Sequence, residues 1–194
     1  MKPGKLFAAA AIFAALASAC AGTVKSRYEL AENPVNAAAR EKTRTAKLYH
    51  QLDTIIILDA ILDDDGLRNA WADEDASRRR LGDEEKKAAL EKLNTEDGGV
   101  KMILALYTAS EEWNDLAEKN SRWTVFLETS KGPVRPASIE KTKVEKLYLR
   151  DNLPFDPIFR KFYIVKFTKE AAGSPPYKLM MSGQLGETSV AWDK

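Results

Sequence analysis

The second half of the 194-residue chain is a series of short segments rich in β-branched and aromatic residues, separated by turn-forming residues. The turn-forming stretches include 131–133, 174–176 and 183–186, where glycine supplies positive φ and proline fixes the chain direction. This pattern predicts strands at 100–107, 123–129, 134–142, 161–168, 177–182 and 188–192. Together with one earlier strand, about seven strands are expected, which is enough for a sandwich of two antiparallel sheets.

Helical segments precede these strands. Asn33-Pro34 begins a predicted helix, with Asn33 as its N-cap. The β-branched stretch at 52–62 predicts a buried strand, although a buried helix has a similar composition. Residues 67–93 have a helical pattern that breaks just before Asp83, a second predicted N-cap. We therefore predict an α+β domain, mainly an antiparallel β-sandwich, with a helical insertion at about 65–95 after the first strand.

Cys20 is the only cysteine in the chain, so the folded domain is expected to hold together without disulfides. Cys20 follows an uncharged, alanine-rich run at 6–19, which is itself preceded by Lys2 and Lys5. The run is shorter than the roughly 20 apolar residues that span a bilayer, and a basic start followed by an apolar run is the layout of a secretory signal. We therefore assign 1–19 to a signal peptide, 20–33 to a tether and 34–194 to a single domain.

The residues Ala17-Ser18-Ala19-Cys20 resemble the lipobox of bacterial lipoproteins. This resemblance implies cleavage before Cys20, acylation of its thiol and anchoring in a cell-envelope membrane, and Ala21 in the next position favours the outer membrane. Ala17 stands where the family usually has leucine, and Ala17-Ser18-Ala19 also fits ordinary signal cleavage. The alternative is therefore a soluble exported protein. We favour the lipid anchor, because acylation would remove a lone thiol that has no partner in the chain.

Charge and motifs exclude several classes of function. The chain has 30 basic and 29 acidic residues, and loss of Lys2 and Lys5 with the signal would take the net charge from +1 to about −1. This balance lacks the basic excess that is typical of nucleic-acid binding. His50 is the only histidine, and the sequence contains no P-loop, zinc-ligand set or G-x-S-x-G motif. We therefore expect no nucleic acid, no cofactor and no catalytic residues, and we place His50 on a strand.

The acidic turn at 63–66 raises the question of a divalent cation, with Asp63 and Asp65 as weak candidate ligands. An EF-hand loop has acidic residues at its first, third and fifth positions and a glutamate at its last position. Here Ile61 and Ala72 occupy the first and last positions, so the EF-hand motif is not met. The favoured interpretation is a solvated turn with acidic residues at a helix N-terminus, and a nonstandard cation site is the alternative.

Two other clusters carry candidate contacts. A polar connector is flanked by the residues that we would expect to contact a sugar ring or a partner, namely Trp113, Asn114, Asp115 and Trp123. Aromatic residues more often pack into a core, which is the competing interpretation. The basic cluster at 78–80 lies beside acidic residues. That neighbourhood favours a solvated helix surface, with anionic lipid headgroups as the alternative partner.

Together these features predict a lipid-anchored cell-envelope protein, held at the outer membrane and facing the periplasm or the surface. Its expected role is that of a non-enzymatic binding or structural accessory with a protein partner in the envelope. A carboxylate-dependent envelope hydrolase is one alternative, and two close carboxylates in a pocket would favour it. A carrier of an apolar ligand is another, and a cavity between the sheets would favour that function.

Overall fold

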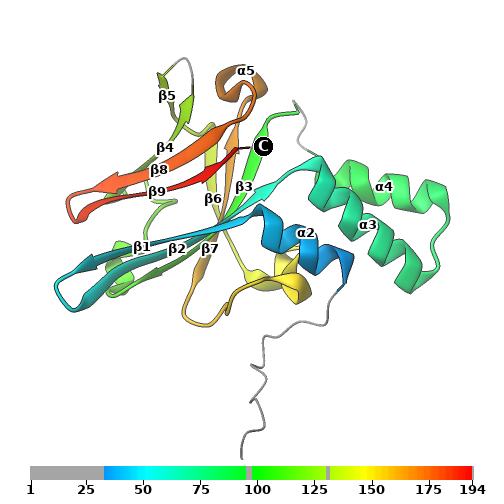
Figure 1. Cartoon of the computed structure of the whole chain (residues 1–194), viewed down its shortest axis with the longest axis horizontal. Helices are drawn as coiled ribbons and strands as arrows, with labels where there is room; N and C mark the ends of the chain where they lie inside the picture. The colour runs from blue at the N-terminus through cyan, green and yellow to red at the C-terminus, as the bar shows by residue number, and fades with distance from the viewer. Residues whose placement is uncertain (1–32, 95–97, 130–131, 194) are drawn as a thin grey trace, which may run out of the picture.

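The computed structural model describes residues 33–94, 98–129 and 132–193. Within these residues the chain has an α+β fold with four α-helices and nine strands, and the strands form two antiparallel sheets (Figure 1). This confirms the predicted fold class. The predicted signal peptide, Cys20 and nearly all of the predicted tether lie outside the described residues.

The larger sheet has the strand order β1-β2-β3-β7-β6, and the smaller sheet has the order β5-β4-β8-β9. The strands of the larger sheet are β1 (Thr43–His50), β2 (Asp53–Asp63), β3 (Val100–Thr108), β7 (Lys161–Phe167) and β6 (Ser138–Thr142). Those of the smaller sheet are β5 (Gly132–Val134), β4 (Trp123–Thr129), β8 (Tyr177–Gly183) and β9 (Gly186–Trp192). Arg44 of β1 donates from Nε to the carbonyl oxygen of Ala191 in β9 at 3.0 Å. This hydrogen bond links the edges of the two sheets on one side of the sandwich.

Each α-helix follows a residue that caps its N-terminus. They are α2 (Pro34–Lys42), α3 (Asp65–Arg79), α4 (Asp83–Leu93) and the short α5 (Lys169–Ala172). The predicted N-cap Asn33 accepts a hydrogen bond from the backbone N–H of Asn36 at 2.8 Å, which satisfies one of the free donors of the first turn. The helical insertion is confirmed as α3 and α4. However, α4 is capped by Gly82, whose N–H donates to Glu85 at 3.0 Å, so the predicted N-cap Asp83 is instead the first helical residue.

The structure contains one strand that was not predicted, and it divides one strand that was predicted. The predicted first strand is the second arm of a hairpin, because β1 precedes β2 and the two pair in antiparallel register with a two-residue turn at 51–52. The predicted strand at 134–142 is split into β5 and β6, which belong to different sheets. Pro136 lies at the break, where its missing N–H removes a ladder donor. The additional strand β1 and the division of 134–142 explain why nine strands are present instead of about seven.

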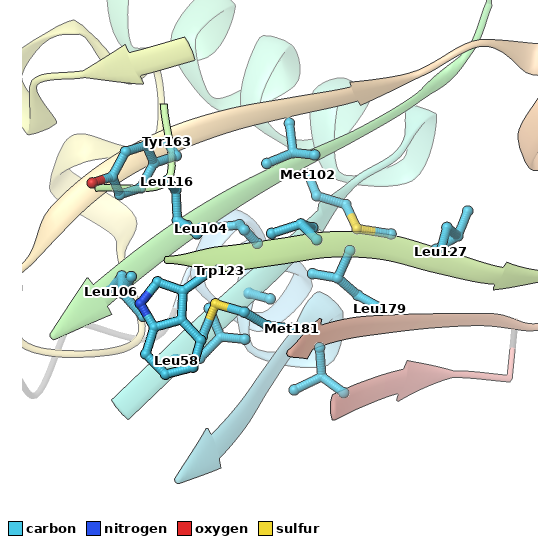
Figure 2. Close-up of a cluster of buried hydrophobic side chains, with 14 of the residues drawn as sticks. Leu58, Met102, Leu104, Leu106, Leu116, Trp123, Leu127, Tyr163, Leu179 and Met181 are labelled. Carbon is cyan, nitrogen blue, oxygen red and sulfur yellow. The ribbon is translucent and has the colours of Figure 1, made fainter. Parts of the chain in front are cut away.

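Apolar side chains fill the space between the sheets. The residues shown in Figure 2 include Leu58, Met102 and Leu104 from the larger sheet and Leu127 and Leu179 from the smaller sheet, all of them buried. A second apolar cluster lies on the outer face of the larger sheet, under α2, α3 and the segment that carries two short 3-10 helices, η2 (Val144–Lys146) and η3 (Arg150–Asn152). The larger sheet is therefore covered on both faces and forms the middle of three layers.

The helices and the hairpin turns lie at opposite ends of the molecule. In Figure 1, α2, α3 and α4 occupy one end of the long axis, and the turns of the β1–β2 and β8–β9 hairpins lie at the other end. This separation places the acidic turn at 63–66 and the hairpin turns far apart in the molecule.

Candidate functional site

The carboxylate of Asp63, at the end of β2, is the centre of a buried polar network at the helical end. Its Oδ1 accepts hydrogen bonds from Arg68 Nε at 2.9 Å and from the hydroxyl of Tyr148 at 2.7 Å. Its Oδ2 lies 2.7 Å from the ammonium group of Lys101 on β3. Because Asp63 and Lys101 are directly opposite each other in the β2–β3 register, the sheet itself holds this ion pair in place. The network joins the sheet, α3 and the segment that carries η2 and η3.

The other two acidic residues of the turn also have cationic partners. The Nζ of Lys42, in the last turn of α2, lies 2.8 Å from Asp64, and Nη1 of Arg68 lies 3.0 Å from Asp65. Asp64 is the N-cap of α3 and accepts from the backbone N–H of Leu67 at 2.9 Å. Three carboxylates thus face three cations, so the turn is electrostatically neutral. Arg68 lies between Asp63 and Asp65, where a shared cation would bind. In the part of the chain that the structure describes, no group of three or more acidic, histidine or cysteine side chains is arranged to hold a metal ion.

Burial and hydrogen bonding fix the protonation states around this turn. Burial, followed by the nearby charge of Asp63, raises the pKa of Tyr148 well above its ordinary value. The hydrogen bond to Asp64 raises the pKa of Lys42. Tyr148 therefore remains a hydrogen-bond donor and Lys42 remains a cation across the physiological pH range. A cavity of about 430 Å³ opens beside Asp63, Arg68 and Lys101, but both oxygens of the carboxylate already face cations. The arrangement suits stabilisation better than proton transfer to a substrate.

Two further carboxylates are buried, and each has a cationic partner. Asp59 on β2 forms an ion pair with Arg160 and accepts a hydrogen bond from the hydroxyl of Thr45. Asp75 on α3 is bound by Arg78 at 2.9 Å and by Arg79 at 3.0 Å. With Asp63, these are the buried carboxylates among the described residues. Each of them thus lies against at least one guanidinium or ammonium group.

The aromatic connector residues named from the sequence are held by hydrogen bonds inside the fold. Trp123 is buried at the start of β4, and its Nε1 donates to the carbonyl oxygen of Trp113 at 2.7 Å. Figure 2 shows the Trp123 ring in the core near Leu106 and Met181. The bond from Trp123 fastens the short 3-10 helix η1 (Glu111–Trp113) to the edge of the sandwich. The hydrogen bond between Trp123 and Trp113 thus holds the connector in place.

Asn114 and Asp115 complete this attachment. Asn114 is buried, donates from Nδ2 to the carbonyl oxygen of Leu106 at 2.7 Å and accepts from the hydroxyl of Tyr163 at 2.9 Å. Burial raises the pKa of Tyr163 to about 12, so its hydroxyl stays protonated and continues to donate. Asp115 accepts from the hydroxyl of Ser121 at 2.9 Å. The four candidate ligand contacts therefore lie together, and their polar groups bond mainly within the fold.

The hairpin end of the molecule has a different character, which the sequence prediction missed. Leu52, in the turn between β1 and β2, is 99% exposed, and Tyr49 beside it is 56% exposed. Gln51 has a φ of 56° at the first of the two central turn positions, where hairpin turns usually take glycine or asparagine. His50 is exposed at the end of β1. Because Gln51-Leu52 carries no turn signature, the first arm of the hairpin, β1, was not predicted.

The β8–β9 hairpin adds a further apolar side chain at this end. Its turn residue Leu185 is 38% exposed. The neighbouring Gly186, at φ 128°, approaches Leu48 of β1 so closely that a Cβ placed on it would lie 3.0 Å from the Leu48 side chain. The start of β9, directly after the β8–β9 turn, therefore lies against β1 near the end of that strand. We call Tyr49, Leu52 and Leu185 the apolar end. The composition of the sequence gave no direct sign of it, because it depends on the turns of two separate hairpins.

The basic cluster at 78–80 lies at the C-terminal end of α3. Arg78 and Arg79 are largely exposed although both bind Asp75. Arg80 ends the helix in the left-handed conformation, with φ 56°, and its side chain is exposed. Among the described residues Arg80 has no ion-pair partner closer than 4.0 Å. Arg78 and Arg79 therefore fit the predicted helix surface with local charge pairing, and Arg80 does not.

Comparison with known proteins gives no relative from which a function could be transferred: no protein-family model, no curated protein sequence and no solved structure matches the chain. In the described part of the chain, none of the helices is both long enough and apolar enough to cross a bilayer.

Proposed function

We propose that this chain is a lipid-anchored cell-envelope protein that acts as a binding accessory, held to the membrane through Cys20 and contacting a protein partner through the apolar end. The single observation that carries the binding role is the near-complete exposure of Leu52 at a hairpin turn. Turns normally take small or polar residues such as glycine, asparagine and aspartate. An exposed leucine with a tyrosine and a second leucine nearby is typical of a contact surface.

The position of the apolar end supports a protein as the occupant of this surface. The predicted tether joins the domain at Asn33, which is at the helical end, whereas the turns of both hairpins lie at the opposite end (Figure 1). A tether from Cys20 to Asn33 reaches at most roughly 45 Å. An anchored domain would therefore stay close to its membrane and could present the apolar end to a protein beyond it.

The buried polar groups and the core give less support to the two alternative functions. A carboxylate-dependent hydrolase needs an acidic side chain free to exchange a proton with substrate, whereas Asp59, Asp63 and Asp75 are all ion-paired. A carrier of an apolar ligand needs space between the sheets. Side chains from both sheets pack against each other there, including buried Leu58 and Leu179. The accessory role is therefore the function that we retain.

The anchor is tested first, by the mass of the N-terminal peptide of protein purified from its native membrane. We expect a peptide that begins at Cys20 and carries diacylglycerol and acyl groups, and a Cys20→Ser control that carries neither. An unmodified peptide from the unaltered chain would contradict the anchor.

The partner contact is tested separately, by placing a photoreactive residue at position 52 of the anchored protein. We expect crosslinking to one envelope protein, and we expect it to be lost when Tyr49→Ser and Leu185→Ser are added. A photoreactive residue at Lys87, which is exposed on α4, is the matched control. Equal crosslinking at positions 52 and 87, or none at position 52 with Cys20 acylated, would overturn the binding role.

A further inference from the structure

The loop between η3 and β7 carries an exposed aromatic side chain. Phe159 is 85% exposed and Ile158 beside it is 50% exposed, so Leu52 and Phe159 are the two most exposed large apolar side chains among the described residues. Phe159 also has a φ of 61°, a left-handed conformation that is unfavourable for a bulky side chain. Such strain persists where the surrounding structure imposes it, and it is common at binding sites. Phe159 thus resembles Leu52, which follows Gln51 with its φ of 56°.

The residues on both sides of Phe159 hold it in this position. The N–H of Ile158 donates to the carboxylate of Asp156 at 2.8 Å, and Nε of Arg160 donates to the backbone carbonyl oxygen of Asp156, also at 2.8 Å. Arg160 also forms the ion pair with the buried Asp59 of β2. The loop is therefore fastened to the larger sheet at the residue next to Phe159, and the exposed ring is held in place.

Phe159 lies beside the outer face of the larger sheet, where it lines a cavity of about 430 Å³ together with Tyr107 of β3. Tyr107 is directly opposite Ile57 of β2, and Ile57 is opposite Lys47 of β1. The neighbours of these three residues along their strands pack between the sheets, so the three side chains point to the outer face. Tyr49, two residues beyond Lys47, points to the same face. A row of side chains therefore runs from Phe159 to Tyr49, which belongs to the apolar end.

We infer that the protein partner at the apolar end also covers this outer face, with Phe159 as a second anchor that enters an apolar pocket of that partner. This inference rests on the proposed function, because it extends the same contact. Specific interfaces bury roughly 800 Å² on each partner, which is a patch roughly 30 Å across. Adjacent strands are only about 4.8 Å apart, and two strand spacings separate Tyr107 from Lys47. A single partner that contacts Leu52 can therefore also reach Phe159.

The composition of this face favours a protein as its occupant. Its aromatic side chains are Tyr49, Tyr107 and Phe159. Charged groups lie at its edge, where Lys161 pairs with Glu111 at 3.3 Å beside the cavity and Asp156 is exposed. An aromatic centre with a charged rim is typical of protein interfaces. Insertion of Phe159 into a bilayer would instead bring the carboxylate of Asp156 to the membrane, which is unfavourable.

A photoreactive phenylalanine analogue at position 159 of the anchored protein tests this contact in native membranes. We expect crosslinking to the same envelope protein that position 52 captures, identified by the masses of its peptides. Crosslinking at position 159 to lipid, to a glycan or to a different protein, or none at all, would overturn the inference, whereas capture at position 52 would leave the proposed function intact. Absence of crosslinking at position 52 would instead remove the proposed function, and this inference with it.

Phe159→Gly measures the contribution of the ring. Glycine adopts a positive φ without strain, so we expect the thermal unfolding midpoint to stay unchanged or to rise by roughly 2–4 °C. Crosslinking from position 52 is expected to fall roughly tenfold or more, as is usual when an anchor residue is truncated. An unchanged yield from position 52, or a lowered midpoint, would overturn the inference, because the ring would then not contribute to the contact or would be part of the fold.

Phe126→Ala is the matched control, because it removes the same ring from the other sheet. Phe126 is partly buried on β4, and its neighbours along the strand pack between the sheets, so its side chain points to the outer face of the smaller sheet. We expect little change in crosslinking from position 52, and circular dichroism checks that the variant is folded. A loss as large as that of Phe159→Gly in the folded variant would overturn the assignment of the contact to the face beside Phe159.

Discussion

The two ends of this molecule differ in whether their notable side chains have partners within the fold. At the helical end, the buried carboxylates Asp63 and Asp75 have cationic partners, and both α2 and α3 begin at capping side chains. At the hairpin end, Leu52 projects from a turn almost fully exposed, and Tyr49 near the end of β1 is about half exposed. The ion pairs of the acidic turn and of Asp75 thus lie at the helical end, and the almost fully exposed Leu52 lies at the other. This difference predicts opposite responses to mutation.

The largest effect is expected for Asp63→Ala at the helical end. The substitution would leave Arg68 and Lys101 without their shared carboxylate in a buried site, and loss of one partner from such a group costs about 3–5 kcal/mol. The free energy of unfolding in urea measures this loss. Asp65→Ala is the control, because Asp65 is exposed and an exposed ion pair contributes at most about 1 kcal/mol. Similar losses for the two variants would show that the network is not a stabilising centre.

Gly183→Ala tests whether the interior beneath the apolar end is closely packed. A Cβ at position 183 would lie 2.5 Å from the carbonyl oxygen of Arg122 and 2.7 Å from the Trp123 ring. We expect a loss of about 1–3 kcal/mol, as is usual when a packed interior is overfilled. Gly66→Ala is the control: its Cβ would meet the Asp64 side chain at 3.4 Å, and alanine stabilises a helix relative to glycine. If Gly183→Ala caused no loss, this end of the sandwich would be loosely packed.

Tyr163→Phe tests the attachment of the aromatic connector and adds a pH dependence. Loss of the hydroxyl removes a donor to Asn114 and is expected to cost about 1–2 kcal/mol at neutral pH. Because the pKa of Tyr163 in the folded protein is raised to about 12, its stabilising contribution is complete below the ordinary tyrosine pKa of about 10 and is lost as the pH rises toward 12. The difference in unfolding free energy between the unaltered protein and the variant should therefore shrink between pH 10 and 12.

Tyr49→Phe is the control for that measurement, because Tyr49 is exposed on β1. We expect no change in stability at any pH in this range. A constant difference between unaltered protein and Tyr163→Phe from pH 9 to pH 12 would contradict the assigned role of the Tyr163 hydroxyl.

The smallest effect on stability is expected for Leu52→Ser. The side chain of Leu52 is almost fully exposed, so its replacement should change the unfolding free energy by less than about 0.5 kcal/mol. Thermal unfolding monitored by circular dichroism measures this change. A loss above 1 kcal/mol would mean that Leu52 is part of the fold, and its exposure would then no longer indicate a binding surface.

Local sequence signals predicted much of the fold. The alternating segment that became β4 was predicted with its observed bounds, and the Asn33-Pro34 start of α2 was found because capping depends on adjacent residues. The β1–β2 hairpin was missed because Gln51-Leu52 has no residue that favours a turn. Local patterns therefore located most elements, and the errors arose where turn chemistry was atypical.

The two candidate sites were harder to predict for a different reason. Asp63 was recognised as part of an acidic turn, but its partners Lys101 and Tyr148 come from distant parts of the chain. No local sequence pattern indicates that these side chains come together. The apolar end likewise depends on two hairpins that are more than a hundred residues apart in sequence and whose turns lie at the same end of the molecule. Tertiary contacts, and not residue patterns, define both sites.

The most direct test of the account is to measure how far each end of the domain lies from the bilayer. The acylated protein is reconstituted into vesicles that contain phosphatidylglycerol and a headgroup quencher, and a fluorophore is attached through Leu52→Cys or through Ser77→Cys, an exposed position on α3. We predict strong quenching at position 77 and little at position 52. Equal quenching at the two positions, or stronger quenching at position 52, would contradict a domain that is anchored at its helical end and presents its apolar end to a partner.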